Sequence, residues 1–219
     1  MTYVVSNIHG CYADFTALLK EINFSKNDVM FVLGDVVDIG DDPIELVCDL
    51  SMRENVWPVA GEHDKLAAEM LEGFSEMLKE GKTPDAAFIA KMQKWVAMGG
   101  QRTLDGFREL DEDMREGVLD YLGELMLYDE VAVKGKTYFM LNGGIANFDA
   151  DTDPEEYAPE DFAAVKLDMN KEYYSDKIMI TANAEQGVYD KITQRANNIC
   201  IGCETAACLR LEDGEKFYA

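Results

Sequence analysis

The first sixty residues alternate short apolar runs with stretches of helical periodicity, and this alternation constrains the fold most strongly. Apolar runs occur at Tyr3–Ser6, Met30–Leu33 and Val56–Ala60. Between them, apolar residues recur every three or four positions over residues 15–22, and residues 43–52 also have a helical pattern. Strand–helix–strand units of this size predict parallel strands joined by right-handed crossovers, and hence an α/β fold.

The remainder of the chain divides into a helical part and a strand-rich part. Residues 65–124 lack strand signals, and a break at Gly99-Gly100 separates short helical patterns. We therefore predict a helical insert over residues 65–127 within a single domain of residues 1–219. Strand patterns then return at Glu130–Val133, Tyr138–Leu141, Ile178–Ala182, Asn198–Ile201, Ala207–Leu211 and Lys216–Tyr218. Turn signals at residues 134–136 and 213–214 predict hairpins, and thus a mixed or antiparallel second set of strands.

The charge of the chain limits its partners. It carries 43 acidic and 20 basic residues, for a net charge of −23. Such an excess of negative charge disfavours nucleic acids and anionic membrane surfaces as partners. The sequence contains neither an apolar run of membrane-spanning length nor the basic start of a signal peptide. A cytoplasmic location is therefore expected.

The cysteines do not predict a disulfide framework. There are five, an odd number, and they are spread along the chain. Cys200 and Cys203 form a C-x-x-C pattern, but zinc and redox sites need further ligands or a helix start next to such a pair. Because this pair lies in an apolar stretch, we predict buried strand cysteines.

Polar residues gather where the predicted strands end. The two histidines, His9 and His63, each follow an apolar run, in the loops Asn7–Gly10 and Gly61–Asp64. A third such loop, Gly34–Gly40, contains two aspartates. Open α/β sheets hold their ligands at the carboxyl ends of their strands. These three loops are therefore the predicted functional region.

An acidic segment in the second half is a weaker candidate for ion binding. Asp149, Asp151, Asp153 and Glu160 match acidic positions of a calcium-binding EF-hand loop. That loop needs glycine at its sixth position for a sharp turn, and Pro154 stands there instead. We interpret the segment as a solvated loop.

Five short segments occur in a recognisable order: Ser6–Gly10, Gly34–Gly40, Gly61–Asp64, Asn142–Gly144 and Ala182–Ala184. In this order they resemble the motifs of the calcineurin-like metallophosphoesterases. Among these, the small bacterial and phage serine/threonine protein phosphatases are the most similar. The stretch from Trp95 through Gly99-Gly100 to Thr103-Leu104 resembles a further motif of that family. The resemblance implies a four-layer α/β/β/α sandwich of two mixed sheets.

The resemblance also implies a role for each matching residue. Two metal ions bridged by Asp35 would hold the phosphate and activate a water. The first metal would be held by Asn7, His9 and Asp35. The second would be held by Asp35, Glu62, Asn142 and Asn183. His63 would be the general acid, oriented by Asp38, and Lys166 would stand near a phosphate-binding position.

Several of these positions depart from the family pattern. Asn7 replaces an aspartate, Asn142 and Asn183 each replace a histidine, Glu62 replaces an asparagine, and Ile39 replaces a phosphate-binding arginine. The formal charge of the metal shell is unchanged, but its ligands become almost entirely oxygen. Such ligands suit magnesium or calcium better than manganese or zinc. No cofactor is certain, and if an ion binds, we expect one hard cation held by Asp35 and Glu62.

These departures lead us to predict a phosphatase-like protein with impaired catalysis that acts in binding or regulation. Its partner would be an unknown protein or a small phosphorylated ligand. Without metal, the carboxylates would repel a phosphate, and the asparagines would satisfy each other's hydrogen bonds. The alternative is an active phosphoesterase with one atypical metal and His63 as general acid. A third possibility is a scaffolding protein that binds through its helical insert.

Overall fold

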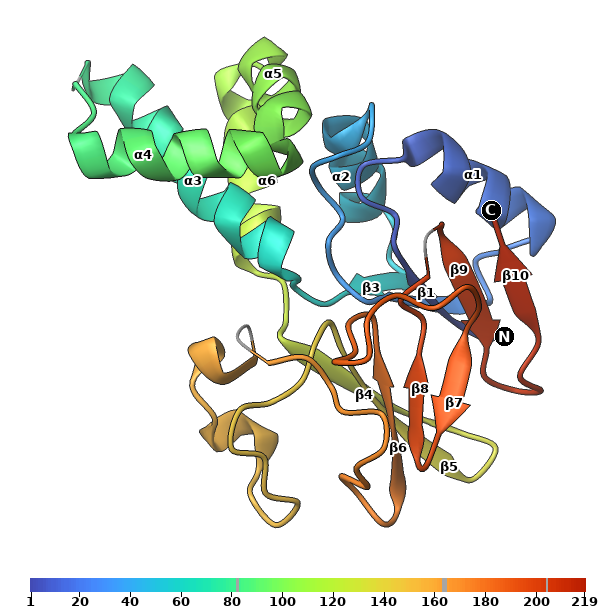
Figure 1. Ribbon diagram of the computed structural model, residues 1–219. Helices are drawn as coiled ribbons and strands as arrows, with labels where there is room; N and C mark the ends of the chain where they lie inside the picture. The colour runs from blue at the N-terminus through green and yellow to red at the C-terminus, as the bar shows by residue number, and fades with distance from the viewer. Residues whose placement is uncertain (82, 163–164, 204) are drawn as a thin grey trace.

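Two five-stranded sheets form the centre of the computed structural model, which describes residues 1–81, 83–162, 165–203 and 205–219 (Figure 1). The first sheet has the order β10-β9-β1-β2-β3. Its strands are β1 (Thr2–Ser6), β2 (Val29–Val32), β3 (Val56–Pro58), β9 (Ala207–Arg210) and β10 (Lys216–Tyr218). The second has the order β4-β5-β6-β8-β7. Its strands are β4 (Tyr128–Val133), β5 (Lys136–Leu141), β6 (Lys177–Thr181), β7 (Thr193–Arg195) and β8 (Asn198–Cys200).

Both sheets are mixed, as predicted. In the first sheet β1, β2 and β3 are parallel, whereas β9 is antiparallel to β1 and β10. In the second, β5, β6 and β8 are parallel, and β4 and β7 run antiparallel at the edges. The predicted strands are confirmed, but β7 was not predicted. Its sequence, Thr193–Arg195, is polar, so nothing in its apolar pattern indicates the pairing with β8.

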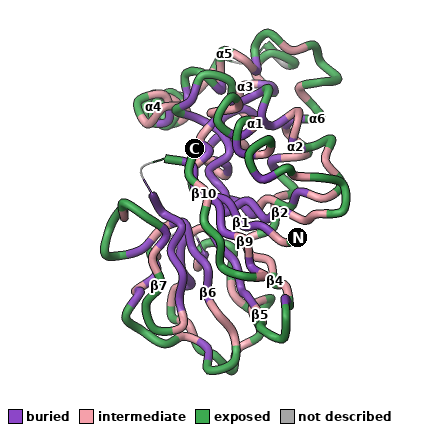
Figure 2. The backbone as a smooth tube through the Cα atoms, turned by 90° about the vertical axis from the view of Figure 1, so that its right-hand side faces the viewer, coloured by how far each residue is buried: buried purple, intermediate pink, exposed green. Residues whose placement is uncertain are grey.

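Alternation along the strands sends their side chains into separate cores. Val4 of β1 joins Tyr138 and Met140 of β5 between the two sheets. Val5 packs on the other face of the first sheet, against the helices. The neighbours in β5, such as Phe139, pack on the outer face of the second sheet. In the inner strands of both sheets, most residues are buried (Figure 2).

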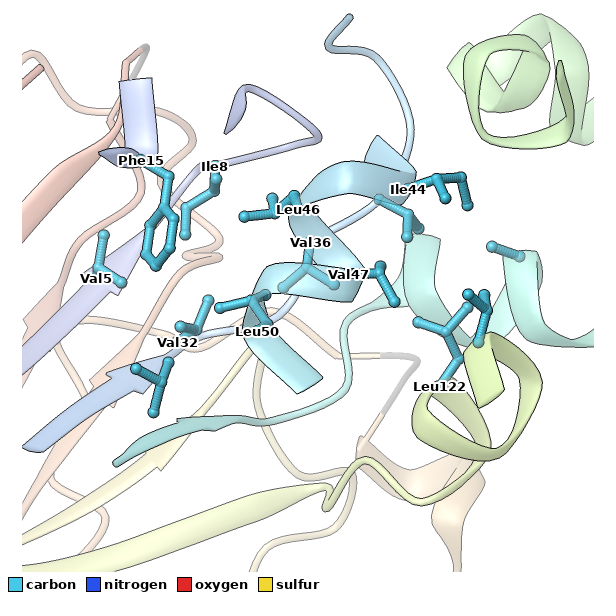
Figure 3. Packing of buried hydrophobic residues seen from close by; sticks show 14 of the residues in the cluster. Val5, Ile8, Phe15, Val32, Val36, Ile44, Leu46, Val47, Leu50 and Leu122 are labelled. Atoms are coloured by element: carbon cyan, nitrogen blue, oxygen red, sulfur yellow. The ribbon is translucent and has the colours of Figure 1, made fainter. Parts of the chain in front are cut away.

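Helices cover the outer face of the first sheet. They are α1 (Tyr12–Glu21) and α2 (Pro43–Ser51), and their apolar faces meet β1 and β2 through Phe15, Leu46 and Leu50 (Figure 3). Helix α2 also contacts the helical insert. The insert comprises α3 (Glu62–Glu80), α4 (Ala86–Trp95), the wide turn η1 (Val96–Gly100), α5 (Gln101–Glu109) and α6 (Glu112–Gly123).

The insert begins earlier than the sequence indicated. The predicted start was residue 65, with Glu62, His63 and Asp64 in a loop, but these three residues form the first turn of α3. The Asp64 carboxylate accepts the backbone N–H of Gly61 at 2.8 Å, which starts the helix at Glu62. The consequence is that His63 stands on a helix rather than in a loop.

The outer face of the second sheet has a thinner cover. The segment between β5 and β6 holds two short 3₁₀ helices, η2 (Pro154–Glu156) and η3 (Pro159–Phe162). The rings of Phe139 and Phe162 stack on either side of Tyr128, with centroids 4.9 and 5.6 Å away. The four-layer arrangement is confirmed, and the fourth layer consists of 3₁₀ turns and aromatic side chains. The predicted solvated loop forms part of it.

Two further expectations concern cysteines and membranes. Cys200 and Cys203 are buried and free, as predicted. Within the described residues, no helix is both long enough and apolar enough to cross a bilayer.

Candidate active site

The loops that follow β1, β2, β3, β5 and β6 meet at one cleft. Its cavity has a volume of about 260 Å³. The residues predicted for the metals and the phosphate all line it, namely Asn7, His9, Asp35, Glu62, Asn142, Lys166 and Asn183. His63 lines it too, whereas Asp38 lies beneath His63 and is fully buried. The residues that the sequence analysis singled out therefore share one cleft.

The loops around the cleft hold a strained backbone. Non-glycine residues with positive φ include Asn7 (61°), His9 (40°), Asp35 (53°), Asp38 (67°) and Ile39 (60°). Such left-handed conformations cost about 1 kcal/mol each, and they concentrate at functional sites. A β-branched isoleucine is especially unfavourable at such a position. Its side chain is 56% exposed and does not line the cleft.

Asp64 ties two of these loops together. Its buried carboxylate accepts backbone N–H groups of Asp35 at 2.7 Å, Val36 at 2.8 Å and Val37 at 3.3 Å, besides that of Gly61. Complete burial, and then the nearby Asp35 carboxylate, raise the pKa of Asp64 to about 7. The sequence analysis gave this residue no role. It falls within a quoted segment, but its burial cannot be deduced from the sequence.

A second hydrogen-bond network orients His63. The ring Nδ1 lies 2.8 Å from Oδ2 of Asp38, and this hydrogen bond raises the pKa of His63. Asp38 also accepts from Trp95 Nε1 at 2.9 Å and from Thr103 Oγ1 at 2.7 Å. All three supporting side chains are fully buried. His63 and Asp38 are therefore paired as predicted, and two side chains of the insert also donate hydrogen bonds to Asp38.

The junction of α4 and α5 brings these two donors to one carboxylate. Trp95 ends α4, and Thr103 lies in α5, after a change of direction at Gly99 (φ 115°). A Cβ on Gly100 would collide with the Trp95 ring, so only glycine fits there. The carbonyl of Gly99 accepts the backbone N–H of Ile39 at 3.1 Å. The insert is thus fixed directly to the strained loop after β2.

His9 differs from His63 in its surroundings. Its ring meets the His63 ring edge to face, with centroids 5.4 Å apart. Burial lowers the pKa of His9, and its Nδ1 is buried with no hydrogen-bond partner among the residues that the structure describes. A neutral His9 therefore stands beside a His63 that binds a proton more readily.

A chain of amides occupies the other side of the cleft. Asn183 Nδ2 donates to Asn142 Oδ1 at 3.0 Å, and Asn142 Nδ2 donates to Asp35 Oδ2 at 3.0 Å. Asn142 Nδ2 also donates to the Leu33 carbonyl at 2.7 Å. The other Asp35 oxygen accepts the His63 backbone N–H at 3.0 Å. Asn7 Nδ2 donates to the carbonyl of Cys203. The asparagines do bond one another, as the sequence analysis considered.

These contacts test whether a second metal fits. The NH₂ group of Asn142 cannot be reversed, since its oxygen would then face the Leu33 carbonyl and the Asp35 carboxylate. Asn142 therefore turns donors, not a lone pair, toward the residue that would bridge the metals. Across the described residues no three His, Cys, Asp or Glu side chains form a metal-binding group. The predicted set Asp35, Glu62, Asn142 and Asn183 shares one cleft, but its donors do not suit a cation there.

Two lysines line the same cleft. Lys166 is exposed, and Lys65 is half-buried. The Lys65 Nζ donates a hydrogen bond to the Pro159 carbonyl at 3.3 Å. Burial lowers the pKa of Lys65. The sequence analysis considered Lys166 and missed Lys65, although Lys65 directly follows the segment Gly61–Asp64. Its position on α3, one residue beyond the hydrogen-bonded Asp64, places it at the cleft.

A second cavity of about 390 Å³ adjoins the cleft. It shares Asn7, His9, Lys166 and Asn183 with the first. The rest of its lining is mostly small or apolar, and includes Ala182, Ala184, Gly187, Val188 and Gly202. The two cavities together form an elongated site with Lys166 where they meet.

The chain belongs to the family of calcineurin-like phosphoesterases, whose model matches residues 2–188. The fold and the loops at the strand ends agree with this assignment. The resemblance identified from the five segments is therefore confirmed at the level of the family. Members of this family use divalent metals, and which metal this chain would bind is not shown by the match.

Curated relatives match a shorter part of the chain. A symmetrical bis(5'-nucleosyl)-tetraphosphatase of Buchnera aphidicola subsp. Acyrthosiphon pisum (strain Tuc7) is 38% identical over 81 residues. The match covers 36% of this chain and 30% of the relative. The protein of the same name from Glaesserella parasuis serovar 5 is 30% identical over 101 residues, covering 43% of this chain and 37% of its own length. The matched segments thus span about a third of these relatives.

Solved structures share the fold at low sequence identity. A proposed diadenosine tetraphosphatase has a TM-score of 0.67 and 14% identity, over 100% of this chain and 92% of that one. A protein serine/threonine phosphatase from Saccharomyces cerevisiae has a TM-score of 0.58 and 12% identity, over 100% of this chain and 79% of that one. These similarities show the fold alone.

Proposed function

We propose that this phosphoesterase-family chain binds a phosphate-bearing ligand in the cleft with cations of its own, Lys65, Lys166 and His63. In this proposal, the amide chain on Asp35 takes the place of the second metal. The ligand is a small phosphorylated molecule or a phosphorylated protein. The cleft then serves recognition first, and hydrolysis is weak or absent.

One observation carries this proposal. The NH₂ group of Asn142 donates to Asp35 and to the Leu33 carbonyl, and Asn183 fixes the Asn142 oxygen. Each Asp35 oxygen thereby accepts an N–H group. N–H donors make the electrostatic potential around the Asp35 carboxylate less negative. In the family, metal cations bound to this carboxylate would have that effect.

The charge balance of the cleft also supports phosphate binding. We expected the carboxylates to repel phosphate, but Asp38 is buried beneath His63 and bonded to it. Asp35 is hydrogen-bonded, and Glu62 is exposed at the rim. The sequence analysis did not include Lys65 in this charge balance. Lys65 and Lys166 together supply two positive charges to the cleft. A lysine is a point charge that binds phosphate without the fork geometry of arginine.

A second candidate is an active phosphoester or phosphoanhydride hydrolase in which His63 is the general acid. The 2.8 Å pair of His63 and Asp38, with its two buried donors, favours this candidate. The curated relatives are named as tetraphosphatases, which also favours it. An elongated site would suit a substrate with a group on each side of the phosphate.

Calorimetry and hydrolysis assays separate the two candidates. Chelator-treated protein is titrated with inorganic phosphate, and then with manganese, magnesium and calcium. The binding proposal expects phosphate binding without metal, weakened about tenfold or more in Lys65→Met and Lys166→Met. Lys26→Met, at an exposed position outside the cleft, is the matched control. Tight binding of two manganese ions per chain, or no metal-free phosphate binding, would contradict the proposal.

The second candidate is tested with p-nitrophenyl phosphate and diadenosine tetraphosphate, each with and without the three metals. Turnover that His63→Gln reduces by about a hundredfold or more would establish it. Asn142→His with Asn183→His would then raise turnover with manganese if the second metal limits the rate. Absence of turnover in every condition, with phosphate binding intact, would leave the binding function.

A further inference from the structure

A separate cavity lies between the two sheets, at the end opposite to the candidate cleft. Its volume is about 370 Å³, within the range of small-molecule pockets. It is lined at the starts of β5 and β6 by Lys136, Tyr138 and Ile178. The same two strands end next to Asn142 and Asn183 of the cleft. One cavity thus opens at each end of the shared strands.

The inner wall of this cavity is apolar. Tyr138, Ile192, Ile199, Leu209 and Leu211 line it, and all five belong to the core between the sheets. Each is 4–8% exposed, so the cavity meets the edge of this core. An apolar body placed here would extend the packing between the sheets, because it would contact side chains from both.

The rim is lined by three cations, Lys136, Arg210 and Lys216, and by two carboxylates that are both already engaged. Arg210 is neutralised by Asp213 and by Glu215, which lies outside the lining. Asp213 pairs with Arg210 at 2.6 Å, and Glu212 accepts the backbone N–H of Thr2 with both oxygens, at 2.8 and 3.0 Å. Lys136 forms no ion pair within the part of the chain that the structure describes.

The other rim lysine bonds a neutral group. Lys216 Nζ donates to the Ile192 carbonyl at 2.9 Å, and no carboxylate among the described residues forms an ion pair with it. Lys136 and Lys216 come from different sheets, β5 and β10, and border the same cavity. Exposed cations without carboxylate partners are notable in a chain of net charge −23.

We infer that this cavity binds a small amphipathic carboxylate, with its apolar body between the sheets and its carboxylate on Lys136 and Lys216. A long alkyl chain or an aromatic ring would fit the wall formed by Tyr138, Ile199 and Leu209. A compact anion such as acetate would gain only the rim contacts, and a neutral analogue only the wall contacts. This second site does not depend on the function proposed for the cleft.

The test uses 4-phenylbutyrate as the probe, titrated into the full chain and followed by methyl NMR and calorimetry. Binding is expected to shift the methyl signals of Ile199 and Leu209 and to leave the His63 ring signals unchanged. The neutral 4-phenylbutyramide and acetate are each expected to bind about tenfold or more weakly, because each lacks one set of contacts.

Variants locate the carboxylate. Lys136→Met and Lys216→Met are expected to weaken 4-phenylbutyrate binding about tenfold each. Lys134→Met, in the same hairpin but outside the cavity lining, serves as the control and should bind normally. Circular dichroism and the melting temperature establish that each variant is folded. Equal affinity for the acid and the amide, no effect of either lysine variant, or absence of binding at millimolar probe would overturn the inference.

Discussion

The two sides of the cleft differ in where their hydrogen bonds lead. On the His63 side, Asp38 connects the histidine to Trp95 and Thr103, which are buried in the helical insert. On the opposite side, Asn183 and Asn142 lead to Asp35 and end within the cleft itself. His63 is thus held by a network that extends into the insert, whereas the amide side is closed by contacts among the loops of the cleft. The candidate acid–base residue is therefore fixed by the insert, and the candidate metal ligands are fixed by one another.

Substitution of Asp64 should have the largest effect on stability. Its carboxylate binds the backbone of the loop after β2, which carries both Asp35 and Asp38, and the backbone of Gly61. Asp64→Ala removes the acceptor of four buried backbone N–H groups, so we expect a loss of about 3 kcal/mol or more in the free energy of unfolding. Urea denaturation measures it. Asp14→Ala, at an exposed position in α1, should change stability by about 0.5 kcal/mol or less. A similar small change for Asp64→Ala would mean that water can replace this carboxylate.

Asn142→Asp would remove the hydrogen bonds that the Asn142 NH₂ group donates to Asp35 and to the Leu33 carbonyl. The new carboxylate would face Asp35 and the Leu33 carbonyl without a proton to donate, so we expect about 2 kcal/mol of destabilisation in metal-free buffer. Magnesium or calcium should restore much of this stability, since a cation can then bridge the two carboxylates. Thermal unfolding with chelator and with each metal measures both effects. A variant as stable as the parent protein without metal would show that Asn142 is not fixed as described.

Substitutions on the insert would sharpen the other side of the comparison. Trp95→Phe removes one hydrogen bond to Asp38, at a cost of about 1 kcal/mol. Thr103→Val removes two, because Thr103 Oγ1 also accepts the Asp38 backbone N–H at 3.0 Å, so its cost should be about 2 kcal/mol. With fewer donors, the Asp38 carboxylate should attract the His63 proton more strongly, so the pKa of His63 should rise further. NMR titration of the ring signals checks this. An unchanged or lowered pKa in both variants would show that the insert does not act on His63 through Asp38.

The smallest expected effects concern pH. The pKa of His63 is raised above 6.5 by Asp38, and that of His9 is lowered by burial. The His63 pair should therefore stabilise the fold fully below pH 6.5 and lose this contribution as pH rises through the folded pKa. His9 has the opposite sign, because it opposes folding once the unfolded chain is protonated below pH 6.5. The chain has two histidines, so both can be followed by NMR in metal-free buffer. Titration of His9 above His63 would contradict the described geometry.

The sequence predicted the elements whose residues alternate or repeat. Tyr3–Ser6 and Tyr138–Leu141 have the apolar patterns of buried strands, and their positions are confirmed. The polar strand β7 could not be predicted, since its pairing with β8 decides its structure. Asp64 and Lys65 were missed because no local pattern distinguishes a buried carboxylate, or a cleft lysine, from solvated neighbours.

The convergence of the loops was predicted, but the orientation of their side chains was not. Ordered segments indicated which loops would meet, and they do meet. The direction in which Asn142 turns its NH₂ group depends on the Leu33 carbonyl, which the fold brings near from another strand. Such an orientation is a property of the tertiary structure, so the ligand set implied by the family could only be examined in three dimensions.

The bend at Gly99 limits how the insert can vary in length. Trp95 and Thr103 lie on opposite sides of the bend and donate to the same carboxylate, so the chain between them has a fixed length relative to the loop that carries Asp38. Gaining or losing a single residue there would rotate one donor away. An insertion in the turn between α5 and α6 should leave both donors in place.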